Sequence, residues 1–216
     1  MIRGFSYIDI LYLIASIRWT LLLAIMAFSG SAVVGIVTAL LRMAPFRPLR
    51  WIGIIYVQIV QGIPLLAWLF LLYFGMAALG VNINPWLAAA LSFAIYGGAY
   101  LGEVWRGALE SITKTQWEAG ACLGLSYSEQ LRHVIIPQSI RIAIPPTVGF
   151  LVQLIKNTSL ASIIGLIELT RQGQLTTAAT YSPFAVYLTV AVLYFALCFP
   201  LTQWSRSYER KLNAYR

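Results

Sequence analysis

Long uncharged apolar stretches recur along the chain, and they limit its possible folds more than any other feature of the sequence. Each is near the ~20 residues that a helix needs to cross a lipid bilayer. Lipid satisfies no backbone hydrogen bonds, so a spanning chain must form helices or a closed barrel. The stretches are continuous rather than alternating, which favours helices. Spans are therefore predicted at residues 19–41, 51–76, 86–105, 141–165 and 183–204.

The predicted fold is an all-α polytopic membrane protein, with five transmembrane helices in a single domain over residues 1–216. Only 10% of the residues are charged and 60% are apolar, which excludes an ordinary soluble domain. Residues 1–18 are amphipathic and aromatic, so we expect an N-terminal helix that lies along the membrane interface. Residues 106–140 form a long loop between the third and fourth spans, and residues 205–216 form a tail.

Basic residues concentrate on one side of the predicted spans. The positive-inside bias places such loops in the cytoplasm, so we expect the N-terminus outside and the C-terminus in the cytoplasm, with loop 106–140. The net charge of +8 is thereby explained by topology rather than by nucleic-acid binding. Only Arg3, Arg18 and Arg171 lie on the other side. The residues on the basic side are Arg42, Arg47, Arg50, Arg106, Lys114, Arg132, Arg141, Arg206, Arg210, Lys211 and Arg216.

Small residues recur at a spacing of four in two of the predicted spans. This spacing puts each set on one helix face, where small side chains let another helix approach closely. We favour packing between helices of this chain over contact with another subunit. In the first span the residues are Ala27, Ser31, Gly35 and Ala39, and in the third they are Ala90, Ala94, Gly98 and Gly102.

The stretch WEAGACLGLSYSEQLRHVIIPQ, residues 117–138, is polar where its flanks are apolar. Two capping boxes of the form S/T-x-x-E, starting at Thr115 and Ser126, predict two helix starts. Gly124 lies between them, where the first helix needs a left-handed residue at its end. Pro137 is expected to stop the second helix or to reset the chain direction. The pattern predicts a helix, a glycine turn and a second helix on the cytoplasmic surface.

The same stretch resembles the EAA loop of bacterial ABC importer permeases. In that pattern a glycine follows the EAA triplet, and a hydrophobic-x-hydrophobic-Pro ending closes the loop. Gly120 stands where the triplet has its third residue, alanine, which is a small-for-small change. In the family the loop is a coupling helix that sits in a groove on the ATPase subunit and transmits ATPase closure to the spans. The resemblance therefore assigns ATPase coupling to Glu118, Ala119, Gly120, Gly124 and Pro137.

Most of the chain resembles polar amino acid uptake permeases of the histidine, arginine, glutamine and glutamate types. The segments that carry this resemblance are residues 56–75, 98–120, 135–146 and 154–169. Two positions depart from it, because Gln61 stands where arginine is usual and Thr115 where glycine is usual. The resemblance implies a multi-pass protein of the bacterial inner membrane. Its implied partners are a second permease chain, identical or homologous, two ABC ATPase subunits, an extracytoplasmic substrate-binding protein and a polar amino acid.

The chain has no G-x-x-x-x-G-K-[ST] loop and so no phosphate cradle of its own. ATP and Mg²⁺ are therefore expected on the partner ATPases, with no cofactor in this chain. No catalytic set or metal-ligand set emerges, because the single histidine, His133, lacks partners for either. We expect a transport subunit rather than an enzyme. The alternative is an ion-gradient-driven secondary transporter or channel subunit, and an intramembrane enzyme is the weakest of the three classes.

Polar residues crowd the middle of the fourth predicted span, where a lysine costs about 2.5–3.5 kcal/mol to insert. Residues at spacings of three and four share one helix face. The functional interpretation is a wet translocation surface on which Lys156 attracts a substrate carboxylate. The residues concerned are Gln153, Lys156 and Asn157 on one face, with Thr158 and Ser159 extending the polarity around the helix.

The alternative for Lys156 is a structural or gating role, which we favour. In that case its side chain reaches an interface or pairs with Glu168 or Glu103. Glu103 is also three residues before Arg106, a spacing that predicts a local ion pair at the end of the third span.

The second predicted span carries two glutamines followed by a helix breaker. Gln58 and Gln61 share a face, and Pro64 is expected to kink the helix. For Gln61, lining of the substrate pathway and simple hydrogen bonding between helices are equally favoured. Our hypothesis is that Gln61 and Lys156 face a shared cavity at the interface of two permease chains.

Overall fold

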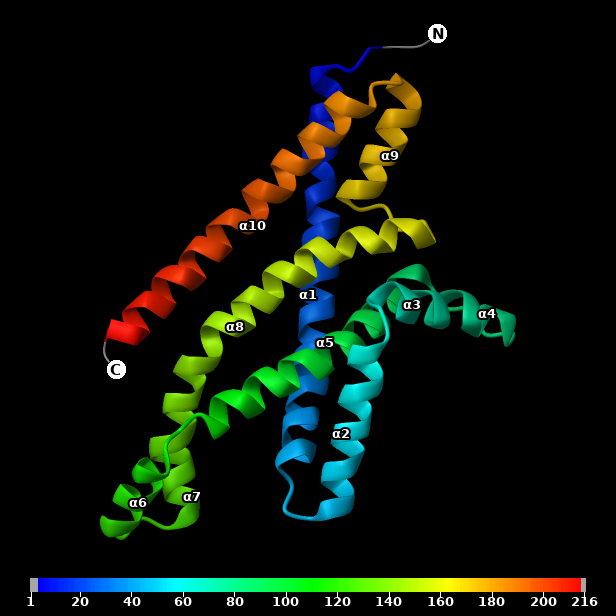
Figure 1. Cartoon of the computed structure of the whole chain (residues 1–216). Helices are drawn as coiled ribbons and strands as arrows, with labels where there is room; N and C mark the ends of the chain where they lie inside the picture. Colours follow the sequence, from blue (N-terminus) through cyan, green and yellow to red (C-terminus); the bar gives the residue numbers. More distant parts are fainter. Residues whose placement is uncertain (1–3, 215–216) are drawn as a thin grey trace.

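The computed structural model describes residues 4–214, and every regular element in that part of the chain is helical. Long helices that are joined by short connections cross one another along their lengths (Figure 1). In chain order the elements are α1 (Tyr7–Met43), α2 (Arg47–Gly62), α3 (Leu65–Phe70), a π-helical turn (Leu71–Gly75), α4 (Met76–Ala78), α5 (Pro85–Glu110), α6 (Lys114–Cys122), α7 (Tyr127–Gln130), a second π-helical turn (Leu131–Ile135), α8 (Ile136–Asn157), a 3-10 segment (Thr158–Ile164), α9 (Leu169–Thr180) and α10 (Pro183–Ala214).

The predicted spans correspond to long apolar helices and one bent pair. Four helices in the described residues are long and apolar enough to cross a membrane: α1, α5, the helix Tyr127–Ile164 that contains α7 and α8, and α10. α2 and the segment Leu65–Ala78 pass the same test together as a bent pair, and counting this pair as one span gives five, with the pair second in chain order. The predicted fold class, an all-α polytopic membrane protein, is confirmed.

The second span breaks at Pro64 instead of kinking there. α2 ends where the N–H of Ile63 bonds to the Val60 carbonyl oxygen at 3.4 Å, and Pro64 takes the N-cap of α3. Proline has no N–H to offer the preceding turn, which favours a kink or a break at this position. The two halves meet at 99°, and the chain turns away sideways after α2 (Figure 1).

The N-terminal segment predicted to lie along the interface is not a separate helix. Residues 1–3 of that segment lie outside the described residues, and from Tyr7 onward it forms the first part of α1. The sequence has no glycine or proline between Tyr7 and Ser29, so nothing ends the helix before the first span. At 1.5 Å per residue α1 is about 55 Å long, which exceeds the ~30 Å hydrocarbon core of a bilayer.

The small-residue faces of α1 and α5 pack against each other. Ser31 of α1 donates a hydrogen bond to the Phe93 carbonyl of α5 at 2.9 Å. A Cβ atom added to Gly98 would stand only 2.3 Å from the Val34 side chain. The two backbones therefore approach closely because these positions carry almost no side chain. The interpretation as packing within the chain is confirmed.

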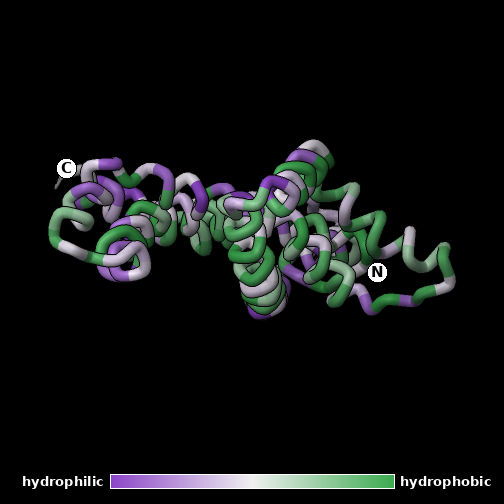
Figure 2. The backbone as a smooth tube through the Cα atoms, turned by 90° about the horizontal axis from the view of Figure 1, so that it is seen from below, coloured by the Kyte–Doolittle hydropathy of each residue, from purple (hydrophilic) through white to green (hydrophobic). Residues whose placement is uncertain are grey.

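The two ends of the molecule carry different elements. The start of α1 and α9 lie at one end, and α6 and α7 lie at the other (Figure 1). α10 runs back toward the α6 end, where Leu212 lines a pocket with Thr113 and Gln138. The predicted tail 205–216 continues α10 as far as Ala214. Figure 2 shows that hydrophilic positions are most frequent in the part of the molecule nearest the C-terminus.

Candidate functional site

α6 begins after Thr113, two residues before the predicted start. Thr113 is the N-cap, with extended backbone, and Thr115 and Glu118 lie inside the helix. The capping box predicted at Thr115 is therefore wrong. Ile112 is buried directly before the cap, so packing of the chain against the bundle decides where α6 starts. A four-residue sequence pattern carries no information on that packing.

The predicted glycine turn after α6 is confirmed. Gly124 has a φ of +75°, in the left-handed region that glycine adopts without strain. Its N–H bonds to the Ala121 carbonyl at 2.9 Å, and the N–H of Leu125 reaches back to the Gly120 carbonyl at 3.1 Å. These two bonds form a Schellman motif, which satisfies the last carbonyls of α6 and turns the chain toward α7.

The second predicted capping box, at Ser126, is confirmed. The Glu129 N–H donates to Ser126 Oγ at 3.4 Å, and the Ser126 N–H donates to Glu129 Oε2 at 2.8 Å. The Ser126 hydroxyl donates to the same carboxylate at 2.6 Å. These hydrogen bonds favour the ionised form and lower the pKa of the Glu129 carboxyl below its ordinary value.

Pro137 does not stop or redirect the second helix, contrary to the prediction. α7 passes through the π-helical turn Leu131–Ile135 into α8, which has Pro137 in its first turn. Proline lacks a donor and crowds the carbonyl four residues earlier, and the wider π turn takes up this mismatch. The result is one helix, Tyr127–Ile164, that joins the loop directly to the fourth span.

Part of the loop forms an exposed surface of mixed polarity. Glu118 and Ala119, two of the predicted coupling residues, are exposed on α6. Leu123 and Tyr127 beside them are 80% and 70% exposed. Large exposed apolar side chains next to a free carboxylate are typical of a contact with another protein. We call Glu118, Ala119, Leu123 and Tyr127 the α6–α7 surface.

The remaining predicted coupling residues, Gly120, Gly124 and Pro137, lie outside this surface. Gly124 and Pro137 are exposed, at the turn and in the first turn of α8. Gly120 is the one buried residue of α6 and faces Gln130. Gln130 was missed by sequence reasoning, because nothing in its local pattern indicates that it is buried.

The polar residues of the fourth span divide between two environments. Gln153 and Lys156 are exposed, and the Gln153 side-chain amide donates to Asn157 Oδ1 at 3.0 Å, so the predicted shared face is present. Thr158 is fully buried and donates to a carbonyl of the preceding turn at 2.7 Å. Ser159 donates in the same way, also at 2.7 Å. The helix narrows to 3-10 geometry at this point, which turns Thr158 into the core.

Neither of the predicted acidic partners pairs with Lys156. Glu103 is bound by two arginines. Glu168 is buried and accepts a hydrogen bond from the Tyr194 hydroxyl at 2.8 Å. Burial raises the pKa of the Glu168 carboxyl, and its hydrogen bonds only partly offset this. Lys156 therefore stands exposed on α8, without either carboxylate.

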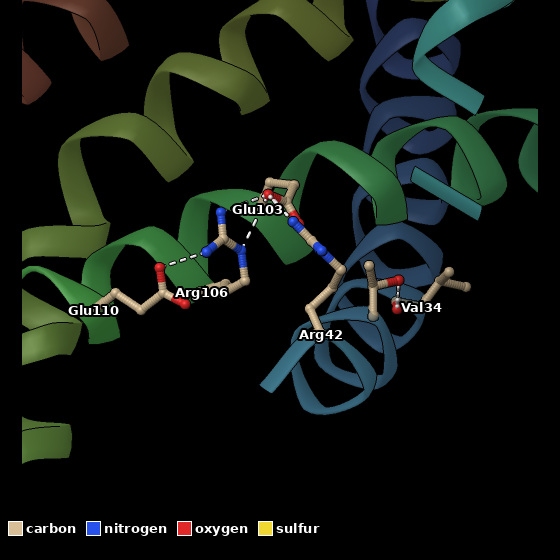
Figure 3. Close-up of polar contacts among 6 residues, drawn as sticks. Val34, Arg42, Glu103, Arg106 and Glu110 are labelled. Atoms are coloured by element: carbon tan, nitrogen blue, oxygen red, sulfur yellow. Dashed lines mark hydrogen bonds and ion pairs between the residues drawn. The ribbon is translucent and has the colours of Figure 1, made fainter. Parts of the chain in front are cut away.

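A chain of ion pairs joins the end of α1 to α5 (Figure 3). Arg42 Nε donates to Glu103 Oε1 at 2.6 Å, and Arg106 Nη2 lies 2.8 Å from Glu103 Oε2. Arg106 also pairs with Glu110. The Glu103–Arg106 pair predicted from sequence spacing is confirmed. The pairing of Arg42 with Glu103 was missed, because 61 residues separate them and only the packing of α1 on α5 brings them together.

Gln61 lies exposed at the end of α2, just before the break at Pro64. An apolar cavity of about 790 Å³ lies between α1, α5, α8 and α10, and neither Gln61 nor Lys156 lines it. Both side chains are exposed on the single chain. A cavity shared by them would therefore need a second chain to enclose it.

The sequence matches a known family and several known proteins along most of its length. Residues 31–214 match the family described as binding-protein-dependent transport system inner membrane component. The probable amino-acid ABC transporter permease protein YckA of Bacillus subtilis (strain 168) is 36% identical over 94% of this chain and 90% of its own length. The L-cystine transport system permease protein TcyB of the same organism is 38% identical over 92% of this chain and 86% of its own length. The glutamine transport system permease protein GlnP of Escherichia coli (strain K12) is 33% identical over 93% of each chain.

Solved structures show the same fold. A chain in the crystal structure of an amino acid ABC transporter with histidines matches with a TM-score of 0.87 and 30% identity, over 93% of this chain and 94% of that chain. An inward-facing structure of the MetNI methionine ABC transporter matches with a TM-score of 0.66 and 18% identity, over 94% of each chain, and so supports the fold alone. On this evidence the chain belongs to the family of binding-protein-dependent transport system inner membrane components, as an ABC transporter permease.

Proposed function

We propose that this chain is the membrane-spanning subunit of an ATP-driven importer of polar amino acids. The observation that carries the proposal is the α6–α7 surface, which is exposed and is joined by one helix to the polar face of α8. Partner ABC ATPases would bind and hydrolyse ATP with Mg²⁺ and move this surface. The helix Tyr127–Ile164 would pass the movement to Gln153 and Lys156, so that the solute site opens alternately to the two sides of the membrane.

Contact with an ATPase suits the chemistry of the α6–α7 surface. Leu123 and Tyr127 offer apolar area whose burial contributes roughly 25 cal/mol per Å². Glu118 would pair with a basic side chain and so fix the orientation of the contact. Gly124 keeps the turn compact, because a larger residue would be strained at its positive φ.

A polar amino acid suits the exposed face of α8. The Lys156 ammonium would attract the α-carboxylate of the solute, and the amides of Gln153 and Asn157 offer both donors and acceptors. Gln61, exposed at the break of the second span, would add a further amide. The relatives named as amino-acid, L-cystine and glutamine permeases support this substrate class.

Two permease chains, identical or homologous, would enclose the pathway. An exposed ammonium such as that of Lys156 is costly against lipid, and a second chain would shield it in a wet cavity. A substrate-binding protein would deliver the solute at the end that carries the start of α1 and α9. The distribution of basic residues favours an N-terminus outside and a C-terminus in the cytoplasm of a bacterial inner membrane.

Co-purification of the chain with the products of neighbouring genes tests the assignment. We expect an ABC ATPase to co-purify, and a ligand-loaded binding protein to stimulate its ATP hydrolysis. Glu118→Arg and Gly124→Arg should both separate ATP hydrolysis from uptake in proteoliposomes. An intact and fully coupled complex from these variants would contradict the proposed ATPase contact.

The substrate pathway is tested separately by Gln61→Ala and Lys156→Met. Each should raise the substrate concentration needed for half-maximal uptake and for stimulation of ATP hydrolysis, while the complex still assembles. An apparent affinity equal to that of the wild type in both variants would remove Gln61 and Lys156 from the pathway.

A further inference from the structure

Gly120 allows α6 to lie unusually close to α7. It is the one buried residue of a helix whose other positions are exposed or half-buried. A Cβ atom added to Gly120 would stand 2.9 Å from Gln130 Cγ and 3.2 Å from Gln130 Cδ. In real proteins a Cβ atom almost never comes within 3.0 Å of a heavy atom in a residue that is not its neighbour in the chain. Any side chain at position 120 would therefore push the two helices apart or displace Gln130.

Gln130 fills the space that Gly120 leaves. It is only 8% exposed, and its side-chain amide donates to the Leu125 carbonyl at 2.8 Å. The N–H of Leu125 bonds in turn to the Gly120 carbonyl at 3.1 Å. Leu125 is thus held from both sides, by the backbone of α6 and by the side chain of Gln130 at the end of α7. The contact locks the turn between the two helices.

A ring stack and a hydrogen bond between side chains also hold α6 in place. The rings of Trp117 and Tyr127 stack with centroids 5.4 Å apart, and the Gln138 amide donates to Gln116 Oε1 at 3.1 Å. Each contact has one exposed partner, Tyr127 or Gln116, which can change rotamer when helices shift. The contact of Gly120 with Gln130 is buried, so the Gln130 side chain has less room to change rotamer.

We propose that Gly120 and Gln130 are a matched pair that positions α6 on the helix Tyr127–Ile164, and so sets the direction in which the α6–α7 surface meets the ATPase. The EAA pattern has alanine at position 120, and its methyl group would need the space that Gln130 takes here. Both are positioning residues, because neither belongs to the α6–α7 surface. The inference rests on the proposed ATPase contact and adds the residues that orient it.

The test adds a methyl group at position 120, shortens the side chain at position 130, and combines the two changes. Each variant is studied in the complete complex, reconstituted with its ATPases and binding protein. The readout is the amount of substrate transported per ATP hydrolysed, with basal ATP hydrolysis measured beside it. Gly120→Ala should lower this ratio by roughly fivefold, the factor that matches the smaller overpacking penalties. Gln130→Ala should lower it less, because it frees the Leu125 carbonyl without a clash. The double variant should recover to within about twofold of the wild type, because neighbouring sites do not add independently.

Gly107→Ala is the matched control, because a Cβ at Gly107 meets nothing within 4 Å. Alanine favours a helix more than glycine does, so a loss at Gly120 alone cannot come from helix propensity. The pairing would be overturned if the fold-loss of transport per ATP in the double variant equals the product of the fold-losses in the two single variants. Gly120→Ala could prevent the complex from assembling. In that case, assembly of the double variant would support the pair. If the double variant fails to assemble while Gln130→Ala assembles normally, the pairing is overturned. A wild-type chain that brings down no ATPase would instead refute the proposed function.

Discussion

Arg42 and Glu103 illustrate how single residues connect helices that are distant in the sequence. Their side chains are 19% and 22% exposed, so their ion pair is shielded more than a surface pair. Arg106 adds a second donor to the same carboxylate, whereas the Glu110 side chain, the last in this series of ion pairs, is 56% exposed. The shielded central carboxylate should therefore matter far more to stability than the terminal one.

Replacing Glu103 by glutamine should lower the free energy of unfolding by about 1–3 kcal/mol, because two partly buried guanidinium groups lose their counter-charge. Thermal unfolding of the protein purified in detergent measures this change as a lower midpoint. Glu110→Gln is the matched control and should change stability by less than about 0.5 kcal/mol. Equal midpoints for the two variants would show that the chain of ion pairs does not stabilise the α1–α5 contact.

At the scale of elements, α1 and α5 act as a closely packed pair, and Gly98 tests how close the contact must be. Gly98→Ala should cost about 1–3 kcal/mol, because its methyl group would overlap the Val34 side chain. Gly107→Ala lies on the same helix in open space and should leave stability unchanged or slightly raised. Denaturation midpoints of the two variants give the comparison. If Gly98→Ala is as stable as Gly107→Ala, the close approach is not required.

The start of α7 should be sensitive to pH through Glu129. Its folded-state pKa is lowered, so the carboxylate stabilises the cap above the ordinary pKa of 4.5, and this contribution is lost as the pH falls through the lower folded value. Hydrogen exchange of residues 127–135, corrected for intrinsic rates, should show protection at neutral pH that fades in acid. Glu129→Gln should remove the pH dependence. A wild-type segment that keeps its protection at every pH down to unfolding would contradict the role of the cap.

At the scale of the whole molecule, membrane orientation is open to a direct test with a natural thiol. Cys122 is exposed at the end of α6, and Cys198 lies in α10 and can be replaced by alanine. We expect a membrane-impermeant maleimide to label Cys122 in inside-out vesicles and not in right-side-out vesicles, since the basic loops should lie in the cytoplasm. Solubilised protein serves as the control for full labelling. The opposite pattern would reverse the proposed topology.

Much of the architecture could be predicted because lipid imposes long apolar runs and because caps are local. The spans, the glycine turn at Gly124 and the box at Ser126 all depend on residues within a few positions of one another. Contacts that depend on how helices meet could not be predicted. Arg42 finds Glu103 only through the packing of α1 on α5, and Gln130 is buried only because Gly120 lets α6 approach.

The sequence rules for helix ends also failed at one of the prolines. Pro137 should stop a helix by its own chemistry, yet the wide turn Leu131–Ile135 lets the chain continue as one helix. Pro64 has the same chemistry, and there the chain breaks at 99°. The two prolines differ in the structure around them, which the sequence pattern alone does not reveal. The candidate substrate residues show the same limit, since Thr158 turns into the core away from its polar neighbours.

The unbroken helix Tyr127–Ile164 has a consequence for how this gene can change length. An α-helix turns by about 100° per residue, so one residue inserted after Pro146 would rotate the α6–α7 surface by about 100° relative to Lys156. An insertion of four residues would rotate it by only about 40°. A substitution leaves this angle unchanged, whereas a single-residue insertion or deletion within the helix changes it. The number of residues between the α6–α7 surface and Lys156 therefore fixes the angle between them about the helix axis.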